Sequence, residues 1–235
     1  MSGVVAIGCP HGRLPPEPGW TTVAIDVIRA STTAITAVER GLRCFPVASL
    51  ETAVPLAARL PDPLLAGELG GSLPYGFHVQ NSPVEMTRTQ DPERPVVLLS
   101  TSGTRLMAEA AASGAALVAC LRNVHATAAH LVRSGRSVRL LGADSRGEFR
   151  EEDKLCCARI AGALTKAGFA ASDRETKQVV SEWGDAPDDA FLGGHSSEYL
   201  RRTGQERDLE FVLAHVDDLD AVFALRRGEL VPVGG

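Results

Sequence analysis

The sequence lacks the features of a membrane or nucleic-acid-binding protein. No apolar run approaches the ~18 residues that a membrane-spanning helix needs. The 24 Lys and Arg residues form no basic run, and the formal net charge is −5. A nucleic-acid-binding domain would carry a basic patch or stripe. These absences predict a protein whose partner is neither a membrane nor a nucleic acid.

The N-terminus lacks the basic segment with which a secretory signal begins. A short apolar stretch at 1–8 is followed by His11, Arg13 and paired prolines, which do not fit such a signal. We therefore expect a cytoplasmic protein.

The cysteines lack the spacings that zinc or thiol chemistry uses. The chain has five cysteines, no Cys-x-x-Cys pair and no Cys-x5-Arg phosphatase loop. An odd number scattered over a chain of this size indicates reduced thiols and not a disulfide framework. We expect them to be buried in the core, where free cysteine is commonly found.

Several familiar phosphate motifs are also missing. The sequence contains no Gly-x4-Gly-Lys-Ser/Thr loop and no Gly-x-Ser-x-Gly elbow. Residues Asp218, Asp220 and Val222 spell the Asp-x-Asp-x-Val of aspartyl-phosphate phosphatases. Because they follow a helix-like segment, 209–216, instead of a strand, we interpret this match as accidental.

What is present is a globular chain with alternating strand and helix patterns. Its 235 residues are 44% hydrophobic and 23% charged, which is ordinary for a globular protein. With no repeat and no convincing linker, a single domain spanning 1–235 is expected. Short β-branched runs precede helical patterns, which is typical of βαβ units. The strand–helix pairs are 22–27 with 32–40, 96–100 with 105–112, 116–120 with 124–133, and 138–142 with 152–167.

Further segments complete the expected fold. Strands are expected at 4–8, 44–47, 64–67 and 221–225. Gly41, Gly114, Gly135 and Gly168 each follow a helical stretch, where a left-handed cap is favourable. The sequence thus predicts an α/β protein of three layers, α/β/α, with a mostly parallel sheet that can include antiparallel strands.

Polar residues gather in the loops that follow the predicted strands, where ligands of open α/β sheets bind. Hydroxyl residues and glycine before a helix leave free N–H groups that suit a phosphate or sulfonate. Two such loops indicate a doubly anionic ligand. The candidates are Asp26, Arg29, Ser31 and Thr32; Glu68, Asn81 and Ser82; Thr101, Ser102, Gly103, Thr104 and Arg105; Asn123; and Asp144, Glu152 and Asp153.

Each candidate also has a purely structural interpretation. The hydroxyl residues can be helix N-caps, and Ser82 followed by Pro83 is typical of one. Asp26 and Arg29 can form a structural ion pair. Glu152 and Asp153 at the start of a helix can simply complement its dipole.

Five of the candidates are carboxylates, namely Asp26, Glu68, Asp144, Glu152 and Asp153. They are hard oxygen ligands without a matching His or Cys cluster, so they favour Mg²⁺ over zinc. Because Mg²⁺ normally uses one or two carboxylates, the others remain available for acid–base chemistry.

The loop from Asp26 to Thr33 resembles the opening motif of the 2-phosphosulfolactate phosphatase family, the ComB-like proteins of coenzyme M biosynthesis. The resemblance covers the chain from about Thr21 onward. It implies a three-layer α/β fold and a Mg²⁺-dependent phosphatase that releases phosphate from a small phosphorylated sulfonic hydroxyacid. The further matching blocks are Gly67–Glu68 with Gly70–Gly71, Gly76–Phe77, Asn81 to Pro83, Thr101 to Arg105, Gly142–Ala143 with Gly147 and Phe149, Glu152–Asp153 with Leu155–Cys156, and finally Leu200, Gly204 and Asp208.

On this interpretation the substrate is 2-phospho-3-sulfolactate, which yields 3-sulfolactate and phosphate. Arg29 and the metal neutralise the phosphoryl oxygens, and the loop of Thr101 to Thr104 holds the second anion. The catalytic residues are expected to be Asp26, Arg29, Glu152 and Asp153, with Mg²⁺ held by Asp26, Glu68 and Asp144. Substrate contacts are expected from Ser31, Thr32, Asn81, Ser82, Thr101, Ser102, Gly103, Thr104 and Asn123.

Two alternatives stay open at this point. One is a phosphatase for another small phosphorylated metabolite, and the other is a non-catalytic anion-binding or regulatory protein on the same scaffold. Carboxylates in the pocket weigh against the second alternative, because a mere binder of anions has no use for them. The sequence also leaves a homodimer open.

Overall fold

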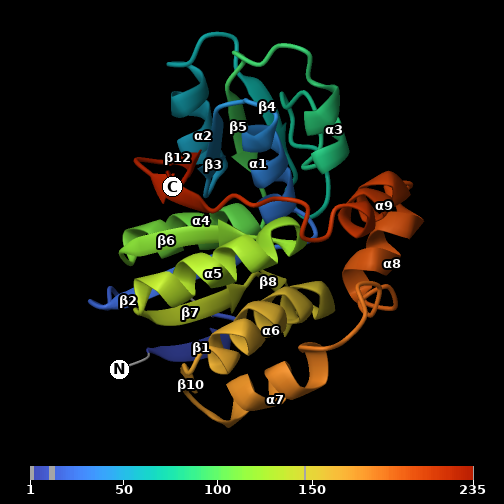
Figure 1. The fold of residues 1–235 in the computed structure, drawn as a ribbon. Helices are drawn as coiled ribbons and strands as arrows, with labels where there is room; N and C mark the ends of the chain where they lie inside the picture. The colour runs from blue at the N-terminus through green and yellow to red at the C-terminus, as the bar shows by residue number, and fades with distance from the viewer. Residues whose placement is uncertain (1–2, 11–13, 146, 235) are drawn as a thin grey trace.

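The computed structural model describes residues 3–10, 14–145 and 147–234, and it contains a ten-stranded sheet with helices on both faces (Figure 1). The strand order is β10-β1-β7-β2-β6-β11-β12-β3-β5-β4. Every strand expected from the sequence is found. The strands are β1 (Val4–Gly8), β2 (Trp20–Ile25), β3 (Cys44–Val47), β4 (Leu64–Gly67), β5 (Val96–Leu99), β6 (Ala115–Ala119), β7 (Ser137–Gly142), β10 (Ala170–Ala171), β11 (Phe223–Arg226) and β12 (Glu229–Pro232).

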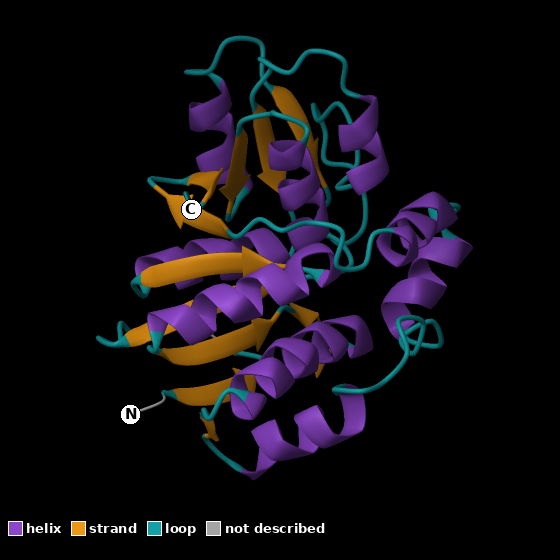
Figure 2. Ribbon diagram, in the orientation of Figure 1, coloured by secondary structure: helices purple, strands orange, loops and turns teal. Residues whose placement is uncertain are grey.

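The helices cover the sheet in two layers, as the purple and orange elements of Figure 2 show. α5, α6 and α7 pack on one face of β1, β7, β2 and β6, and α1 and α4 pack on the other face. This arrangement confirms the predicted three-layer α/β/α fold. The helices are α1 (Ala30–Glu39), α2 (Leu50–Ala57), α3 (Pro83–Arg88), α4 (Gly103–Ala112), α5 (Val124–Ser134), α6 (Glu151–Lys166), α7 (Arg174–Trp183), α8 (His195–Arg202) and α9 (Glu206–Ala214).

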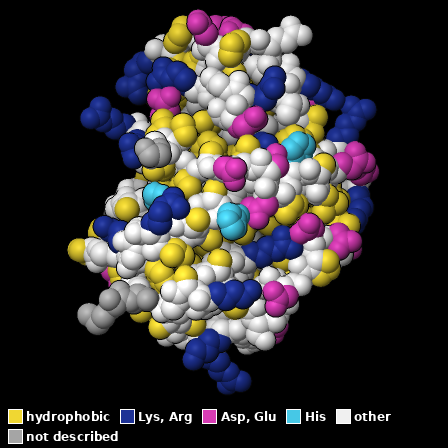
Figure 3. All heavy atoms as spheres, in the orientation of Figure 1, with side chains coloured by type: hydrophobic (Ala, Val, Ile, Leu, Met, Phe, Trp, Pro, Cys, Tyr) yellow, Lys and Arg dark blue, Asp and Glu magenta, His cyan; other side chains and the backbone are white. Residues whose placement is uncertain are grey.

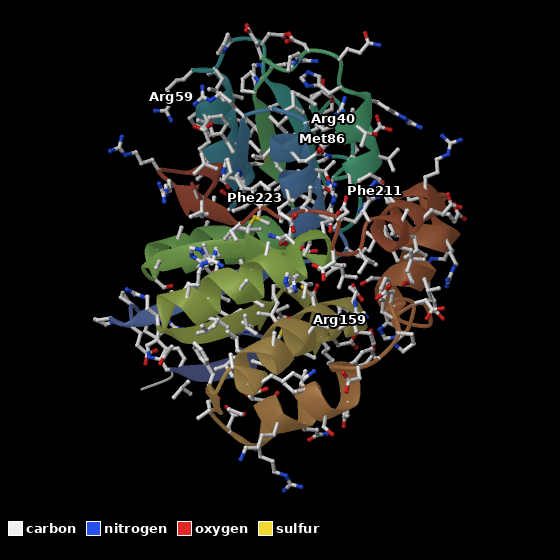
Figure 4. All side chains as sticks on the ribbon, viewed as in Figure 1. Arg40, Arg59, Met86, Arg159, Phe211 and Phe223 are labelled. Carbon is white, nitrogen blue, oxygen red and sulfur yellow. The ribbon has the colours of Figure 1, made fainter. Side chains whose placement is uncertain are left out.

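The sheet contains two parallel parts that the C-terminal hairpin joins. Strands β10, β1, β7, β2 and β6 form one parallel part, and β3, β5 and β4 form the other. The antiparallel strands β11 and β12 lie between them, pairing Phe223 with Val118 and Leu230 with Cys44. Figure 4 labels Phe223 where this hairpin meets the lower part of the sheet. The sheet is therefore mostly parallel but mixed.

Local sequence explains where several elements begin and end. Helix α3 starts at Pro83, and the Ser82 hydroxyl caps it by accepting from the Glu85 amide at 3.2 Å. Helix α5 ends at Ser134, and Gly135 follows with a φ of 65°, the left-handed cap expected there. Strand β2 ends at Ile25, which leaves Asp26 in the loop that follows.

The core contains the cysteines, and the surface mixes charges of both signs. Cys44, Cys120, Cys156 and Cys157 are buried as expected, whereas Cys9 is only partly buried. Among the described residues, no helix is both long and apolar enough to cross a membrane. On the face shown in Figure 3, Lys and Arg side chains stand among Asp and Glu side chains instead of gathering in one patch.

Candidate functional site

A cavity of about 500 Å³ lies beyond the carboxyl ends of β2, β4, β5 and β7. The arrowheads of β6 and β7 point toward the side of the molecule where α8 and α9 lie, and α8 closes the cavity there (Figures 1 and 2). Eight predicted site residues line it: Asp26, Arg29, Glu68, Asn81, Thr101, Ser102, Glu152 and Asp153. The strand-end loops thus bring these eight residues to one place.

Asp26 is buried at the end of β2, between the first turns of two helices. Its Oδ1 accepts a hydrogen bond from the Ala30 amide of α1 at 3.2 Å. Its Oδ2 faces the start of α4, where a Cβ on Gly103 would lie only 1.9 Å away. Gly103 is therefore needed to make room for the carboxylate. Burial, followed by the charge of Glu68, raises the pKa of Asp26 to about 7, although the Ala30 amide and Arg29 oppose the shift.

Asp153 connects the ends of two neighbouring strands. Its Oδ1 accepts from the Val27 amide at 2.8 Å, and its Oδ2 accepts from the Ala143 amide at 3.1 Å. Burial, together with the charges of Asp26 and Glu152, raises its pKa well above the ordinary range. Since both oxygens are engaged with backbone amides, this carboxylate holds the loops after β2 and β7 together.

Glu152 is the carboxylate with an unused oxygen. Its side chain is buried, and its Oε2 has no hydrogen-bond partner within the described part of the chain. Burial raises its pKa to about 7, and a hydrogen bond with Ser196 of α8 partly opposes the shift. An unpartnered buried carboxylate oxygen is costly, which is typical of a group kept for function.

Arg29 is held by α9 and not by Asp26. Its Nη1 donates to Asp208 at 2.5 Å and to Gln205 at 2.6 Å, and both side chains of the Arg29–Asp208 ion pair are almost fully buried. The hydroxyl of Ser82 donates to the other Asp208 oxygen at 2.5 Å. The structural pairing of Asp26 with Arg29 considered above is therefore replaced by a pairing with the C-terminal part of the chain.

Glu68 closes the predicted second anion loop. Its Oε1 accepts from the Thr101 amide at 2.7 Å, and its Oε2 accepts from the Thr101 hydroxyl at 2.8 Å and the Gly71 amide at 2.7 Å. The amide and hydroxyl of Thr101 therefore already bind a carboxylate of the protein itself.

Seven further residues expected to bind the substrate or the metal do not line the cavity. Ser31 accepts from the Asp26 amide, Thr32 donates to the Val27 carbonyl and Thr104 bonds with Ser100, so their hydroxyls stabilise the loops. The Asn123 amide bonds with the Cys120 and Ala221 backbones. Ser82 binds Asp208, Gly103 gives room to Asp26, and Asp144 accepts from the Gly147 amide in the small hairpin of β8 (Asp144–Ser145) and β9 (Glu148–Phe149).

Residues of α8 and of the turn before α6 also line the cavity but were not predicted. Arg150 precedes α6, and the α8 residues are His195, Ser196, Glu198, Tyr199, Leu200 and Arg202. The Tyr199 hydroxyl donates to the Gly71 carbonyl at 2.8 Å and so holds α8 to the loop after β4. An acidic Glu198 in the first turn and basic Arg201 and Arg202 in the last could have indicated this helix from the sequence.

The cavity fits a magnesium ion only in part. Within the described ranges, no three His, Cys, Asp or Glu side chains are arranged to hold a metal, so Asp26, Glu68 and Asp144 are not gathered into one group. Asp26, Glu152 and Asp153 nevertheless place three carboxylates in a site whose buried Arg29 is already paired with Asp208. One carboxylate, waters and a substrate oxygen would satisfy Mg²⁺, which commonly keeps several waters.

Comparison with known proteins identifies the family of this chain. The family description 2-phosphosulpholactate phosphatase matches residues 11–228. A protein of Symbiobacterium thermophilum named probable 2-phosphosulfolactate phosphatase is 31% identical over 91% of this chain and 94% of its own length. A protein of Methanothermobacter thermautotrophicus named 2-phosphosulfolactate phosphatase is 30% identical over 84% of each chain. The chain therefore belongs to the 2-phosphosulpholactate phosphatase family, a family of phosphoric monoester hydrolases.

Proposed function

We propose that this protein hydrolyses a small phosphorylated 2-hydroxy acid, and that the substrate is 2-phospho-3-sulfolactate, which yields 3-sulfolactate and phosphate. The observation that carries this proposal is the cavity itself, where Arg29 lies with Asp26, Glu152 and Asp153 at the ends of β2 and β7. The names of the relatives support the choice of substrate.

Magnesium is proposed as the cofactor, held by Asp26. This carboxylate lines the cavity, and Gly103 at the start of α4 leaves room for its Oδ2. Glu68 is a weaker candidate than the sequence indicated, since three donors of the protein already occupy its oxygens. When bound, Mg²⁺ would neutralise charge on the phosphoryl oxygens and help to orient the phosphate.

Arg29 would bind the equatorial oxygens of the phosphoryl group. Its guanidinium is buried and fixed by Asp208 and Gln205, so it does not need to be ordered when the substrate arrives. Phosphoryl transfer passes through a loose transition state with charge spread over these oxygens, and a positioned arginine stabilises that charge.

Glu152 would supply the proton for the leaving group. As water attacks phosphorus, the bond from phosphorus to the C2 oxygen breaks, and this oxygen takes a proton from the Glu152 carboxyl. Deprotonated Glu152 then regains a proton from solvent, while the attacking water loses its own proton to the released phosphate. A carboxyl with a pKa of about 7 is suited to this role near neutral pH.

Phosphate release from a panel of phosphate esters tests this function. The panel contains 2-phospho-3-sulfolactate, 2-phospholactate and glycerol 2-phosphate, each measured with Mg²⁺ and after chelation by EDTA. We expect release from the two phosphorylated acids, a slower reaction with glycerol 2-phosphate, and loss of activity in EDTA that added Mg²⁺ restores.

Each part of the proposal can fail separately. Full turnover after exhaustive chelation would contradict the magnesium assignment alone. Turnover of glycerol 2-phosphate as fast as that of both acids would contradict the substrate class. No release from any ester by folded protein would leave the non-catalytic anion-binding alternative.

A further inference from the structure

The proposed substrate carries two acidic groups besides the phosphoryl group, and Thr101 and Thr104 do not offer a free hydroxyl to either of them. The amide and hydroxyl of Thr101 both donate to Glu68, and the Thr104 hydroxyl is buried against Ser100. An anion approaching this loop would meet the negative charge of Glu68. Arg150 is a cation elsewhere in the lining of the cavity.

Arg150, Glu148 and His195 form a hydrogen-bonded cluster on another wall of the same cavity. Arg150 Nη1 lies 2.8 Å from His195 Nδ1, and Glu148 Oε2 lies 2.5 Å from the former and 2.9 Å from the latter. All three side chains line the cavity. The Arg150 side chain is only 12% exposed, whereas those of Glu148 and His195 are 53% and 67% exposed. The arginine is thus the fixed member of the cluster.

Two helices begin at this wall. Arg150 occupies the N-cap position of α6, and His195 is the first residue of α8. The two helix starts are packed closely, since a Cβ on Gly194 would lie 2.7 Å from Glu151 Oε2. Two N-termini with positive dipole ends therefore meet beside a largely buried guanidinium.

Glu148 balances this charge when no ligand is bound. Its carboxylate is more than half exposed, and it accepts from the same Arg150 Nη1 that an anionic ligand would use. A carboxylate or sulfonate of the ligand could replace the Glu148 carboxylate as the acceptor of this hydrogen bond, because it carries the same negative charge. A neutral hydroxyl would compete poorly, because hydrogen bonds between charged groups are the stronger ones.

We propose that Arg150, assisted by His195, binds the second acidic group of the substrate, a carboxylate or sulfonate, while Arg29 binds the phosphoryl group. This inference rests on the proposed function for the identity of the ligand. It makes Arg150 a specificity-determining residue and places the phosphoryl group and this acidic group on different walls of the cavity.

Calorimetric titration tests this assignment without requiring turnover. Wild type, Arg150→Gln and the control Arg133→Gln are each titrated with 3-sulfolactate, lactate and inorganic phosphate. Arg133 is exposed on α5 and lies outside the cavity lining. We expect Arg150→Gln to weaken binding of 3-sulfolactate by about 10- to 100-fold, the effect of losing a charge-assisted contact. The affinity for inorganic phosphate should stay within about 2-fold of the wild-type value for both variants.

The lactate titration identifies which acidic group is bound. If lactate loses affinity as strongly as 3-sulfolactate, Arg150 binds the carboxylate. If only 3-sulfolactate loses affinity, Arg150 binds the sulfonate. Unchanged 3-sulfolactate binding, or equal weakening of 3-sulfolactate and phosphate, would overturn the proposal, as would wild type that binds neither acid.

Separate control experiments test whether the variants are folded and whether the proposed function holds. Thermal melting shows whether Arg150→Gln is folded, and His195→Gln and Arg150→Lys provide further variants if it is not. Arg150→Lys, which keeps the charge, should recover part of the affinity. If wild type binds 3-sulfolactate through Arg150 but releases phosphate from no ester, the proposed function fails while this inference stands.

Discussion

Asp26 occupies a position where a carboxylate is costly for the folded protein. It is buried beside Glu152 and Asp153, and burial raises its pKa to about 7. The Gly103 backbone leaves room for its oxygen at the start of α4. This residue is therefore explained better by the chemistry of the cavity than by packing.

Replacing Asp26 by Asn should separate catalysis from folding. We expect kcat/KM to fall by about 100-fold or more, because a charged group at the reacting phosphate is removed. The melting temperature should not fall, since the neutral amide avoids the burial of a charge. Steady-state kinetics and thermal melting measure both effects, and a fully active Asp26→Asn variant would show that Asp26 is structural only.

Asp208 should matter for stability because it neutralises a buried arginine. Asp208→Ala leaves Arg29 without its ion-pair partner, and breaking a buried pair costs about 3 to 5 kcal/mol. Asp218→Ala is a matched control, because the Asp218 side chain of the Arg122–Asp218 pair is 30% exposed. Urea unfolding should show the larger loss for Asp208→Ala, and equal losses would contradict the importance of the buried pair.

At the scale of elements, the C-terminal hairpin joins the two parallel parts of the sheet. β11 pairs with β6, whereas β12 reaches β3 through a single residue pair. Phe223 of β11 is 2% exposed and belongs to the same core cluster as α1 and α4 (Figure 4). The hairpin therefore contributes to the core as well as to the hydrogen bonding of the sheet.

Truncation of the Phe223 side chain should lower the stability of the folded protein strongly. Phe223→Ala is expected to reduce the free energy of unfolding by about 3 to 5 kcal/mol, the usual range for a buried phenylalanine. Val54→Ala, on a side chain that is 64% exposed, should stay within about 0.5 kcal/mol. If denaturant unfolding gives similar values for both variants, the hairpin is not a part of the cooperative core.

The sequence predicted the strands that have clear patterns and missed α2, α7 and α8. β2, β5 and β7 carry β-branched or aliphatic runs that are mostly buried, so their pattern is clear. In α8 only Ser197 and Leu200 are buried, which leaves little apolar periodicity to detect. α2 contains Pro55, a residue that argues against a helix interior.

For the whole molecule, the expectation that ligands bind in the loops after parallel strands predicted the place of the cavity. It did not predict the orientation of every side chain in those loops. Asp26 and Arg29 belong to a loop after a strand, and the parallel sheet brings them to Glu152 and Asp153. The local sequence does not decide whether a hydroxyl such as that of Thr32 binds a ligand or a backbone carbonyl. Tertiary packing decides between the two, and here it directs Thr32 to Val27.

The buried carboxylates also predict how the stability of the whole protein depends on pH. The pKa of Asp26 is raised from 3.8 to about 7, and that of Glu152 from 4.5 to about 7. Between these values the folded state binds more protons than the unfolded state, so this contribution favours folding at low pH and is lost as pH rises to about 7.

Melting temperatures in EDTA test this dependence. We expect wild type to be less stable at pH 8 than at pH 5.5, and the difference should shrink in Asp26→Asn, which has lost one of the titrating groups. Added Mg²⁺ should stabilise the protein more at pH 8, where Asp26 is ionised. If the melting temperature of Asp26→Asn depends on pH as strongly as that of wild type, Asp26 is not one of the groups that titrate in this range.

We propose that phosphate ester cleavage takes place in this cavity, against Arg29 and beside Asp26. The most direct measurement is a crystal structure with Mn²⁺ and tungstate, which replace Mg²⁺ and phosphate and are located by anomalous scattering. We predict the manganese peak at the Asp26 carboxylate and the tungstate peak within hydrogen-bond distance of the Arg29 guanidinium. Peaks at Asp144 or elsewhere outside the cavity, with none at Asp26 and Arg29, would contradict the account.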